Sequence, residues 1–112
     1  MGLFGLNLEK LEKKRDFKGL AKALKHDDTI IRRQVVDILI NMDDDRQANA
    51  LLVNALYDED VTIKVKALEA IRHTEDPSAI NPLLSMYQSK NPKLRNLAKD
   101  VLKEWGALPN SR

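Results

Sequence analysis

Catalysis or metal binding in a chain of 112 residues would need titratable side chains that meet at one point. The chain has two histidines, His26 and His73, and no cysteine. The helical pattern described below puts His26 in the turn before one helix and His73 at the end of another. We therefore expect both imidazoles at the surface, on opposite edges of the molecule, where they cannot share a metal. Because cysteine is absent, neither a disulfide nor a thiolate zinc site is available. The sequence predicts no enzyme, no catalytic residue, no cofactor and no metal.

A row of carboxylates is the other arrangement with chemical potential. Asp37, Glu69 and Asp100 recur at one position of an internal repeat, on the solvent side of successive helices. Such a row could bind a cation or a basic peptide. The alternative is that each acid pairs with a base three or four residues away on its own helix, namely Arg33, Arg72 and Lys103. We favour the intrahelical pairs energetically, and we expect the row to contribute to specificity.

An internal repeat supplies the elements that carry these residues. Residues 45–75 overlay residues 76–106 at an offset of 31, and residues 16–44 overlay the middle unit at an offset of 32. The matching positions include Leu20, Leu52 and Leu83, then Ile31, Ile63 and Leu94, then Val35, Ala67 and Ala98. A period of this size indicates a stacked array in which each unit buries its apolar face against its neighbours.

This repeat predicts an all-α fold without strands. We expect a right-handed α-solenoid of three antiparallel helix pairs with a short N-terminal capping helix. It forms a single domain over 1–112, divided into a lid helix (6–15), repeat one (16–44), repeat two (45–75), repeat three (76–106) and a frayed tail (107–112).

Each repeat divides into a first helix, A, and a second helix, B. The A helices are predicted at 16–25, 46–57 and 77–88, and Pro82 predicts a kink or a late start in the third. The B helices begin at equivalent N-caps, Asp28, Asp60 and Asn91, and Pro92 follows the last of these. Gly106 is a natural stop for the third B helix.

The B helices share an apolar stripe at helical spacing. Its members are Ile31, Val35, Ile38, Leu39, Met42, Ile63, Ala67, Ala70, Ile71, Leu94, Ala98, Val101, Leu102 and Trp105. Beside the stripe, Val36 and Leu68 become Lys99 in repeat three, which predicts that repeat three caps the array. Leu97 either packs toward repeat two and the tail or forms a homodimer contact; we expect a monomer.

Charge and hydropathy exclude several function classes. The net charge of +2 is too small to indicate a nucleic acid or an anionic membrane by itself. No apolar run approaches the roughly 20 residues needed to cross a bilayer. The apolar start at residues 1–6 is too short for a secretory signal, and Leu6 does not fit a myristoylation signal. We expect a cytoplasmic protein.

The repeat resembles a known family. The segment Asp-Pro-Ser-Ala-Ile-Asn-Pro-Leu-Leu at 76–84, with the B-helix openings at Ile31, Ile63 and Leu94, is similar to HEAT repeats, in particular the short repeats related to phycobilisome lyases. The similarity covers about 16–106. It implies a protein-interaction scaffold. In such repeats an acid six residues before a B-helix base forms a ladder between repeats, and Asp58 with Lys64 matches that pattern.

Two enzymatic branches of the HEAT-like proteins do not fit. The resemblance to deoxyhypusine hydroxylase would require paired His-Glu dipeptides, and the chain has none. HEAT-like alkylpurine DNA glycosylases use aromatic residues and an acid on a concave surface, whereas the single tryptophan, Trp105, falls on the core stripe.

We therefore predict a non-enzymatic module or adaptor that binds another protein or peptide. The predicted contact residues, called the B-helix surface from here on, are Arg33, Asp37, Ile40, Val65, Glu69, Arg72, Asn96, Asp100 and Lys103. Ile40 and Val65 would form its apolar centre within a charged rim. The alternative, which we favour less, is nucleic-acid binding through the basic segment from Lys10 to Lys25.

Overall fold

The structure is a computed structural model that describes residues 7–42 and 45–108. Within these ranges all regular structure is helical, and no strand is present. The helices are α1 (Leu8–Lys13), α2 (Phe17–Ala23), α3 (Thr29–Ile40), α4 (Arg46–Ala55), α5 (Val61–Ile71), η1 (Arg72–Thr74), η2 (Pro77–Ala79), α6 (Ile80–Tyr87) and α7 (Pro92–Glu104). The predicted all-α stack is confirmed.

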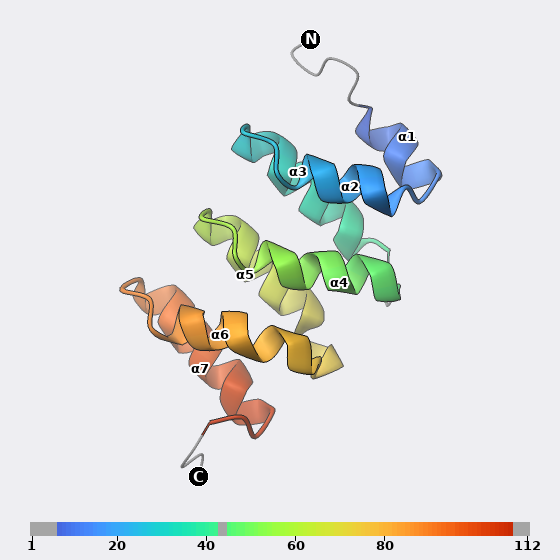
Figure 1. Ribbon diagram of the computed structural model, residues 1–112. Coiled ribbons are helices and arrows are strands. Elements are labelled where there is room, and N and C mark those ends of the chain that lie inside the picture. The colour runs from blue at the N-terminus through green and yellow to red at the C-terminus, as the bar shows by residue number, and fades with distance from the viewer. Residues whose placement is uncertain (1–6, 43–44, 109–112) are drawn as a thin grey trace.

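The helices form two layers (Figure 1). The A helices α2, α4 and α6 lie in one layer, the B helices α3, α5 and α7 lie behind them, and α1 covers the N-terminal end. The B helices contact each other in sequence, α3 with α5 and α5 with α7. The result is an elongated array of 50 × 27 × 16 Å, in which each repeat packs on its neighbours.

The predicted B-helix caps are confirmed. Asp28 accepts the backbone N–H of Ile30 at 2.9 Å, Asp60 accepts that of Ile63 at 3.0 Å, and Asn91 accepts that of Lys93 at 2.9 Å. Each side chain satisfies a backbone donor that has no partner inside the helix. The three repeats therefore begin their second helix in the same way.

The A helices are shorter than predicted, and the third begins late. The 3-10 turn η2 precedes α6, so the α-helix proper starts at Ile80. Pro82 is its third residue, within the first turn, where a proline costs no helical hydrogen bond. The expected late start is confirmed, and Pro82 is buried in the core.

The core follows the predicted stripe along the array. Ile31, Val35, Ile63, Ala98 and Leu102 are each at most 3% exposed. Ile38, Ala70 and Trp105 are half-buried at its margin.

The residues expected to contact the following repeat also agree with the prediction that repeat three caps the array. Val36 and Leu68 are fully buried, whereas Lys99 is exposed. Leu97 is half-buried and packs against the core cluster. This packing supports the first of the two roles considered for Leu97.

The predicted lid helix is short and closely packed. Helix α1 contacts α2, with Leu8 and Leu11 half-buried. Gly19, which from sequence alone only weakens α2, makes this contact possible, because a Cβ there would lie 2.6 Å from a methyl carbon of Leu11. The chain leaves α1 through Arg15 at φ 50°, and the N–H of Asp16 donates to the carbonyl of Leu11 at 2.9 Å.

Helix α7 ends as predicted at Gly106. Gly106 has φ 67°, and the N–H of Ala107 donates to the carbonyl of Leu102 at 2.8 Å, which is a Schellman motif. The start of the predicted frayed tail is ordered instead, since Ala107 and Leu108 pack against the core. The rest of that tail, the apolar start at 1–6 and part of the loop after Met42 lie outside the described residues.

Candidate functional site

The B-helix surface spans three neighbouring helices. The structure places Arg33, Asp37 and Ile40 on α3, Val65 and Glu69 on α5, Arg72 in η1, and Asn96, Asp100 and Lys103 on α7. The predicted acids Asp37, Glu69 and Asp100 are all exposed. Because α5 contacts both α3 and α7, these carboxylates occupy equivalent positions on adjoining helices. The surface is continuous along the array.

The expected intrahelical ion pairs of this surface are wrong for two of the three bases. Arg33 donates through Nε and Nη2 to both oxygens of Asp60, at 3.1 and 2.9 Å. Arg72 donates to Glu104 in the same two-pronged manner, with Nε to Oε1 at 2.8 Å. Asp37 accepts from Lys66 at 2.8 Å. Each pair joins one repeat to the next, because stacking brings the neighbouring repeat as close as the next helical turn.

These cross-repeat pairs affect the acids that take part. The hydrogen bond from Arg33, with help from the N–H of Ile63, holds the pKa of the Asp60 carboxyl below its usual value. The hydrogen bond from Arg72 lowers the pKa of Glu104 in the same way. Both carboxyls are therefore charged at neutral pH. Arg33 and Arg72 therefore also link neighbouring repeats of the array.

The prediction of an exposed apolar centre on this surface is also wrong. Ile40 and Val65 are half-buried and pack against the core, because each lies at the margin of a helix–helix contact. Among residues 7–42 and 45–108, the large apolar side chains that do stand in solvent are Ile30 and Tyr57, each 63% exposed. Neither was singled out from the sequence. Tyr57 lies in the turn after α4, where a helical pattern no longer indicates which way a side chain faces.

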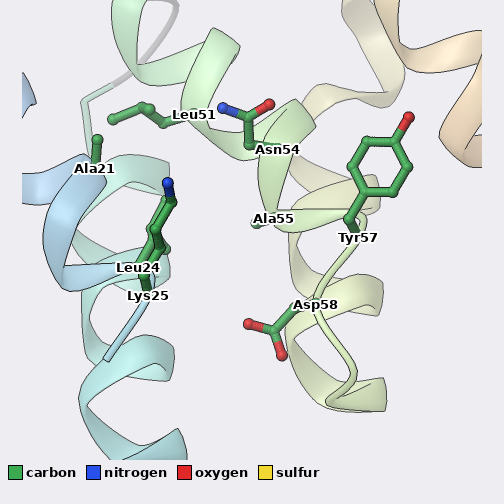
Figure 2. Close-up of a pocket in the computed structure, with 8 residues that line it drawn as sticks. All are labelled: Ala21, Leu24, Lys25, Leu51, Asn54, Ala55, Tyr57 and Asp58. Atoms are coloured by element: carbon green, nitrogen blue, oxygen red, sulfur yellow. The ribbon is translucent and has the colours of Figure 1, made fainter. Parts of the chain in front are cut away.

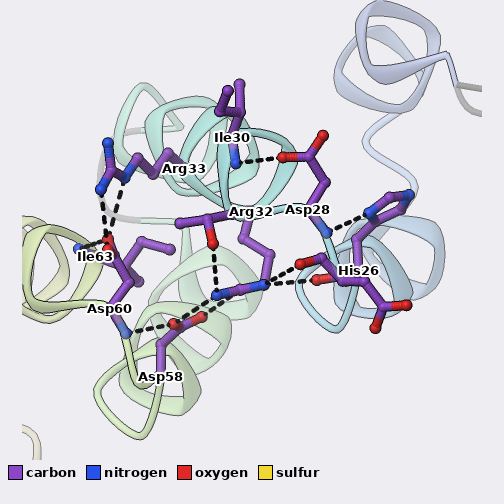
Figure 3. A network of polar contacts seen from close by, with 10 residues as sticks. His26, Asp28, Ile30, Arg32, Arg33, Asp58, Asp60 and Ile63 are labelled. Atoms are coloured by element: carbon purple, nitrogen blue, oxygen red, sulfur yellow. Dashed lines mark hydrogen bonds and ion pairs between the residues drawn. The ribbon is translucent and has the colours of Figure 1, made fainter. Parts of the chain in front are cut away.

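A buried polar network was missed at the sequence level (Figure 3). Arg32 is 7% exposed, and it donates through Nε to Asp58 Oδ2 at 2.9 Å and through Nη2 to Asp58 Oδ1 at 3.3 Å. Its Nη1 donates to the carbonyls of His26 and Asp27 at 2.8 and 3.1 Å. The hydrogen bond to Asp58 raises the pKa of Arg32, which stays charged.

This network corrects two predictions. Asp58 forms the expected contact between repeats, but it does so with Arg32 of the preceding repeat, whereas the sequence pattern matched it with Lys64. His26, expected to face solvent, is half-buried, and its Nδ1 accepts the N–H of Asp28 at 2.9 Å. His26 therefore shapes the turn that presents two carbonyls to Arg32. His73 is exposed, as predicted.

The remaining features offer little chemistry. In the part of the chain that the structure describes, no group of three or more His, Cys, Asp or Glu residues is arranged to hold a metal ion. Within the same residues no helix is long and apolar enough to cross a membrane. The bases of the segment from Lys10 to Lys25 are exposed on α1, α2 and the adjoining turns, and Arg15 is paired with Asp45 and lies 5.7 Å from the ring centre of Phe17.

Comparison with known proteins gives one finding. The profile of a family described as HEAT repeats matches residues 17–103, most of the chain. No match was found among curated proteins.

Proposed function

The chain belongs to the HEAT-repeat family, and we propose that it is a binding module or adaptor whose B-helix surface engages a segment of another protein. HEAT repeats generally mediate contacts between proteins, and the family is typically non-enzymatic. The observation that carries the proposal is the row of exposed carboxylates Asp37, Glu69 and Asp100 on three adjoining helices.

The geometry of the row suits an extended basic segment. Packed helices lie about 8–10 Å apart, and a polyproline II chain advances about 3.1 Å per residue with three residues per turn. Every third residue of a partner in this extended conformation would therefore lie on one face and meet the next carboxylate of the row. Asp37 forms an ion pair with Lys66, and its side chain nevertheless remains 53% exposed. Asn96 and Lys103, both exposed on α7, complete a polar rim beside Asp100.

Nucleic-acid binding through the exposed lysines of α1 and α2 remains the alternative. The lysine side chains of that segment are exposed, which favours it. The acids Asp27 and Asp28 close the segment at one end, and no exposed aromatic is interleaved with the bases, which disfavours it. A filter-binding titration with a duplex at two salt concentrations separates the two functions, because phosphate contacts weaken steeply as salt rises.

The direct test of the proposal is selection from a random peptide library on the intact chain. The selected peptides are then titrated against the triple variant D37N/E69Q/D100N. The matched control E9Q/E12Q/E75Q removes the same number of acids from elsewhere. We expect selected peptides to be rich in Lys or Arg, and to bind the first variant at least tenfold more weakly than the control.

Selected peptides that bind both triple variants with equal affinity would overturn the B-helix surface as the binding site. Circular dichroism of each variant shows that the fold is kept, as expected for exposed side chains away from the core.

A further inference from the structure

A groove opens on the other layer of the molecule, between α2 and α4 (Figure 2). Its cavity is about 280 Å³, and it is lined by Ala21, Leu24, Lys25, Leu51, Asn54, Ala55, Tyr57 and Asp58. Apolar atoms make its floor, and Tyr57, 63% exposed, stands at its edge. A space of this size lies just below the range of roughly 300–1,000 Å³ found for small-molecule sites, so it suits one or two side chains.

The groove continues into an open polar depression. This second space, about 370 Å³, shares Leu24, Lys25, Tyr57 and Asp58 with the first and adds His26, Asp27, Arg32 and Glu59 to its wall. The apolar groove and the polar depression are therefore one surface, called the α2–α4 groove here. It runs from the middle of the A helices to the turns that precede α3 and α5.

The polar end of the groove has an excess of negative charge. Of the bases around the depression, Arg32 is taken by Asp58 and, at the adjoining start of α3, Arg33 by Asp60. Among the residues that line the depression, Lys25 is then left against two exposed acids, Asp27 in the α2–α3 turn and Glu59 in the α4–α5 turn. A ligand that places positive charge at this end is favoured over one that places negative charge there.

The next pair of repeats shows why the groove exists. In the array, the position of Ala21 becomes Val53, that of Leu24 becomes Leu56, and that of Ala55 becomes Met86. Val53, Leu56 and Met86 are 6%, 1% and 2% exposed, whereas Ala21 and Leu24 are only half-buried. Larger side chains thus close the equivalent position between repeats two and three, and two alanines leave it open between repeats one and two.

The charge at the mouth changes in the same comparison. Tyr57, Asp58 and Glu59 of repeat two correspond to Gln88, Ser89 and Lys90 of repeat three. The exposed aromatic side chain and both acids therefore occur together only where the groove is open. Two independent features, the space and the charge, coincide at one junction.

We infer that the α2–α4 groove docks a short segment of a partner protein in which an apolar side chain is followed by one or two cationic side chains. The apolar side chain lies between Ala21 and Leu51, and the cationic ones lie against Tyr57 and Glu59, where a face of the tyrosine ring and a carboxylate both attract positive charge. This surface lies on the A-helix layer, so it stands independently of the B-helix surface.

A titration followed by amide NMR shifts of the intact chain tests this. The probe is a synthetic heptapeptide of glycine and serine with a central leucine followed by two arginines. Two analogues replace the leucine by glycine or the arginines by glutamates. We expect the probe, at up to about 1 mM, to shift amides lining the groove, and each analogue to bind at least fivefold more weakly.

Three variants replace a groove residue by the residue at the equivalent position of the next repeat. They are Ala21→Val, as in repeat two, and Tyr57→Gln and Glu59→Lys, as in repeat three. Each should weaken the probe at least threefold, and Lys90→Glu, at the closed junction, should leave it unchanged. Groove amides that do not move at about 1 mM, shifts confined to Glu69 and Asp100 on the other layer, or equal binding of the glutamate analogue would each overturn the inference.

Discussion

The two junctions between repeats join the same structural unit by different means. Between repeats one and two, the buried pair of Arg32 with Asp58 is joined by the part-buried pair of Arg33 with Asp60 and the exposed pair of Lys66 with Asp37. Repeats two and three are linked by the pair of Arg72 with Glu104 and by the hydrogen bond from the Trp105 indole to the carbonyl of Arg72, at 2.9 Å.

The difference follows from a few substitutions within the repeat. Arg32 becomes Lys64, and the acid that it meets, Asp58, becomes Ser89. At the same time Val53 and Met86 fill the space that Ala21 and Ala55 leave open. The first junction thus has more polar links and keeps a groove, whereas the second has fewer polar links and fills the equivalent space with apolar side chains. A repeat array can vary the two kinds of contact independently, because helix caps and the core stripe already fix the stacking.

Val36→Lys should have the largest effect, since it places a charge in the apolar part of the first junction. Val36 is fully buried, and an unpaired buried charge costs about 3–5 kcal/mol. Urea denaturation measures this loss. Lys99→Leu, at the equivalent but exposed position of α7, should leave the monomer folded and promote end-to-end association seen by light scattering. If both variants behave alike in the two assays, the assignment of Val36 to a junction and of Lys99 to the exposed end of the array is wrong.

Asp58→Ala should be the next most damaging change. It removes the carboxylate that both Nε and Nη2 of Arg32 contact, and leaves a buried guanidinium with hydrogen bonds to carbonyls and Thr29 only. We expect a loss of about 3 kcal/mol in the free energy of unfolding. Glu59→Ala is the matched control, because the neighbouring acid is exposed, and it should change stability little. Equal losses for the two would contradict the stabilising role given to the pair of Arg32 with Asp58.

Trp105→Phe tests the second junction. The indole N–H donates to the carbonyl of Arg72, and phenylalanine keeps most of the apolar contact without that donor. We expect a loss of about 1 kcal/mol. Thermal and urea unfolding measure it, with Tyr87→Phe, at another half-buried aromatic position, as the control. A loss comparable to that of Asp58→Ala would mean that the second junction depends on polar contacts as much as the first.

Acid should weaken both junctions slightly. The N–H of Ala48 and the side chain of Arg15 lower the pKa of Asp45, and Arg33 and Arg72 lower those of Asp60 and Glu104. A carboxyl with a lowered pKa in the folded state stabilises the fold above its unfolded pKa of about 4, and that stabilisation is lost as pH falls through the folded pKa. Urea midpoints should therefore fall from pH 5 to pH 3.

Asp60→Asn should reduce this pH dependence, because asparagine still caps α5 but has no charge to lose. An unchanged urea midpoint between pH 5 and pH 3 in the parent chain would contradict the role given to these ion pairs.

The sequence predicts the repeat and its caps well because both are local. Asp28, Asp60 and Asn91 each bond an N–H two or three residues away, and the core stripe follows from the helical period alone. The side-chain partners of Arg33 and Arg72 lie 27 and 32 residues away. Those contacts depend on how far one repeat is offset from the next in space. The periodicity of the sequence gives no information about that offset.

The burial of Arg32 and the opening beside Ala21 are harder to predict for the same reason. A long basic side chain next to the core stripe can turn either to solvent or inward, and the carbonyls of His26 and Asp27 decide this only after the turn has folded. A groove forms where side chains are too small to fill the space between two helices. It can be recognised only once Ala21 and Val53 are known to occupy equivalent positions at the two junctions.

The most direct test of the central claim, that this module binds protein segments through its B-helix surface, is an amide NMR map of the intact chain with a peptide selected from a random library. We predict shifts centred on Asp37, Glu69 and Asp100, with the peptide's affinity lost in D37N/E69Q/D100N and kept in E9Q/E12Q/E75Q. Shifts that leave α3, α5 and α7 untouched for every selected peptide would contradict the account.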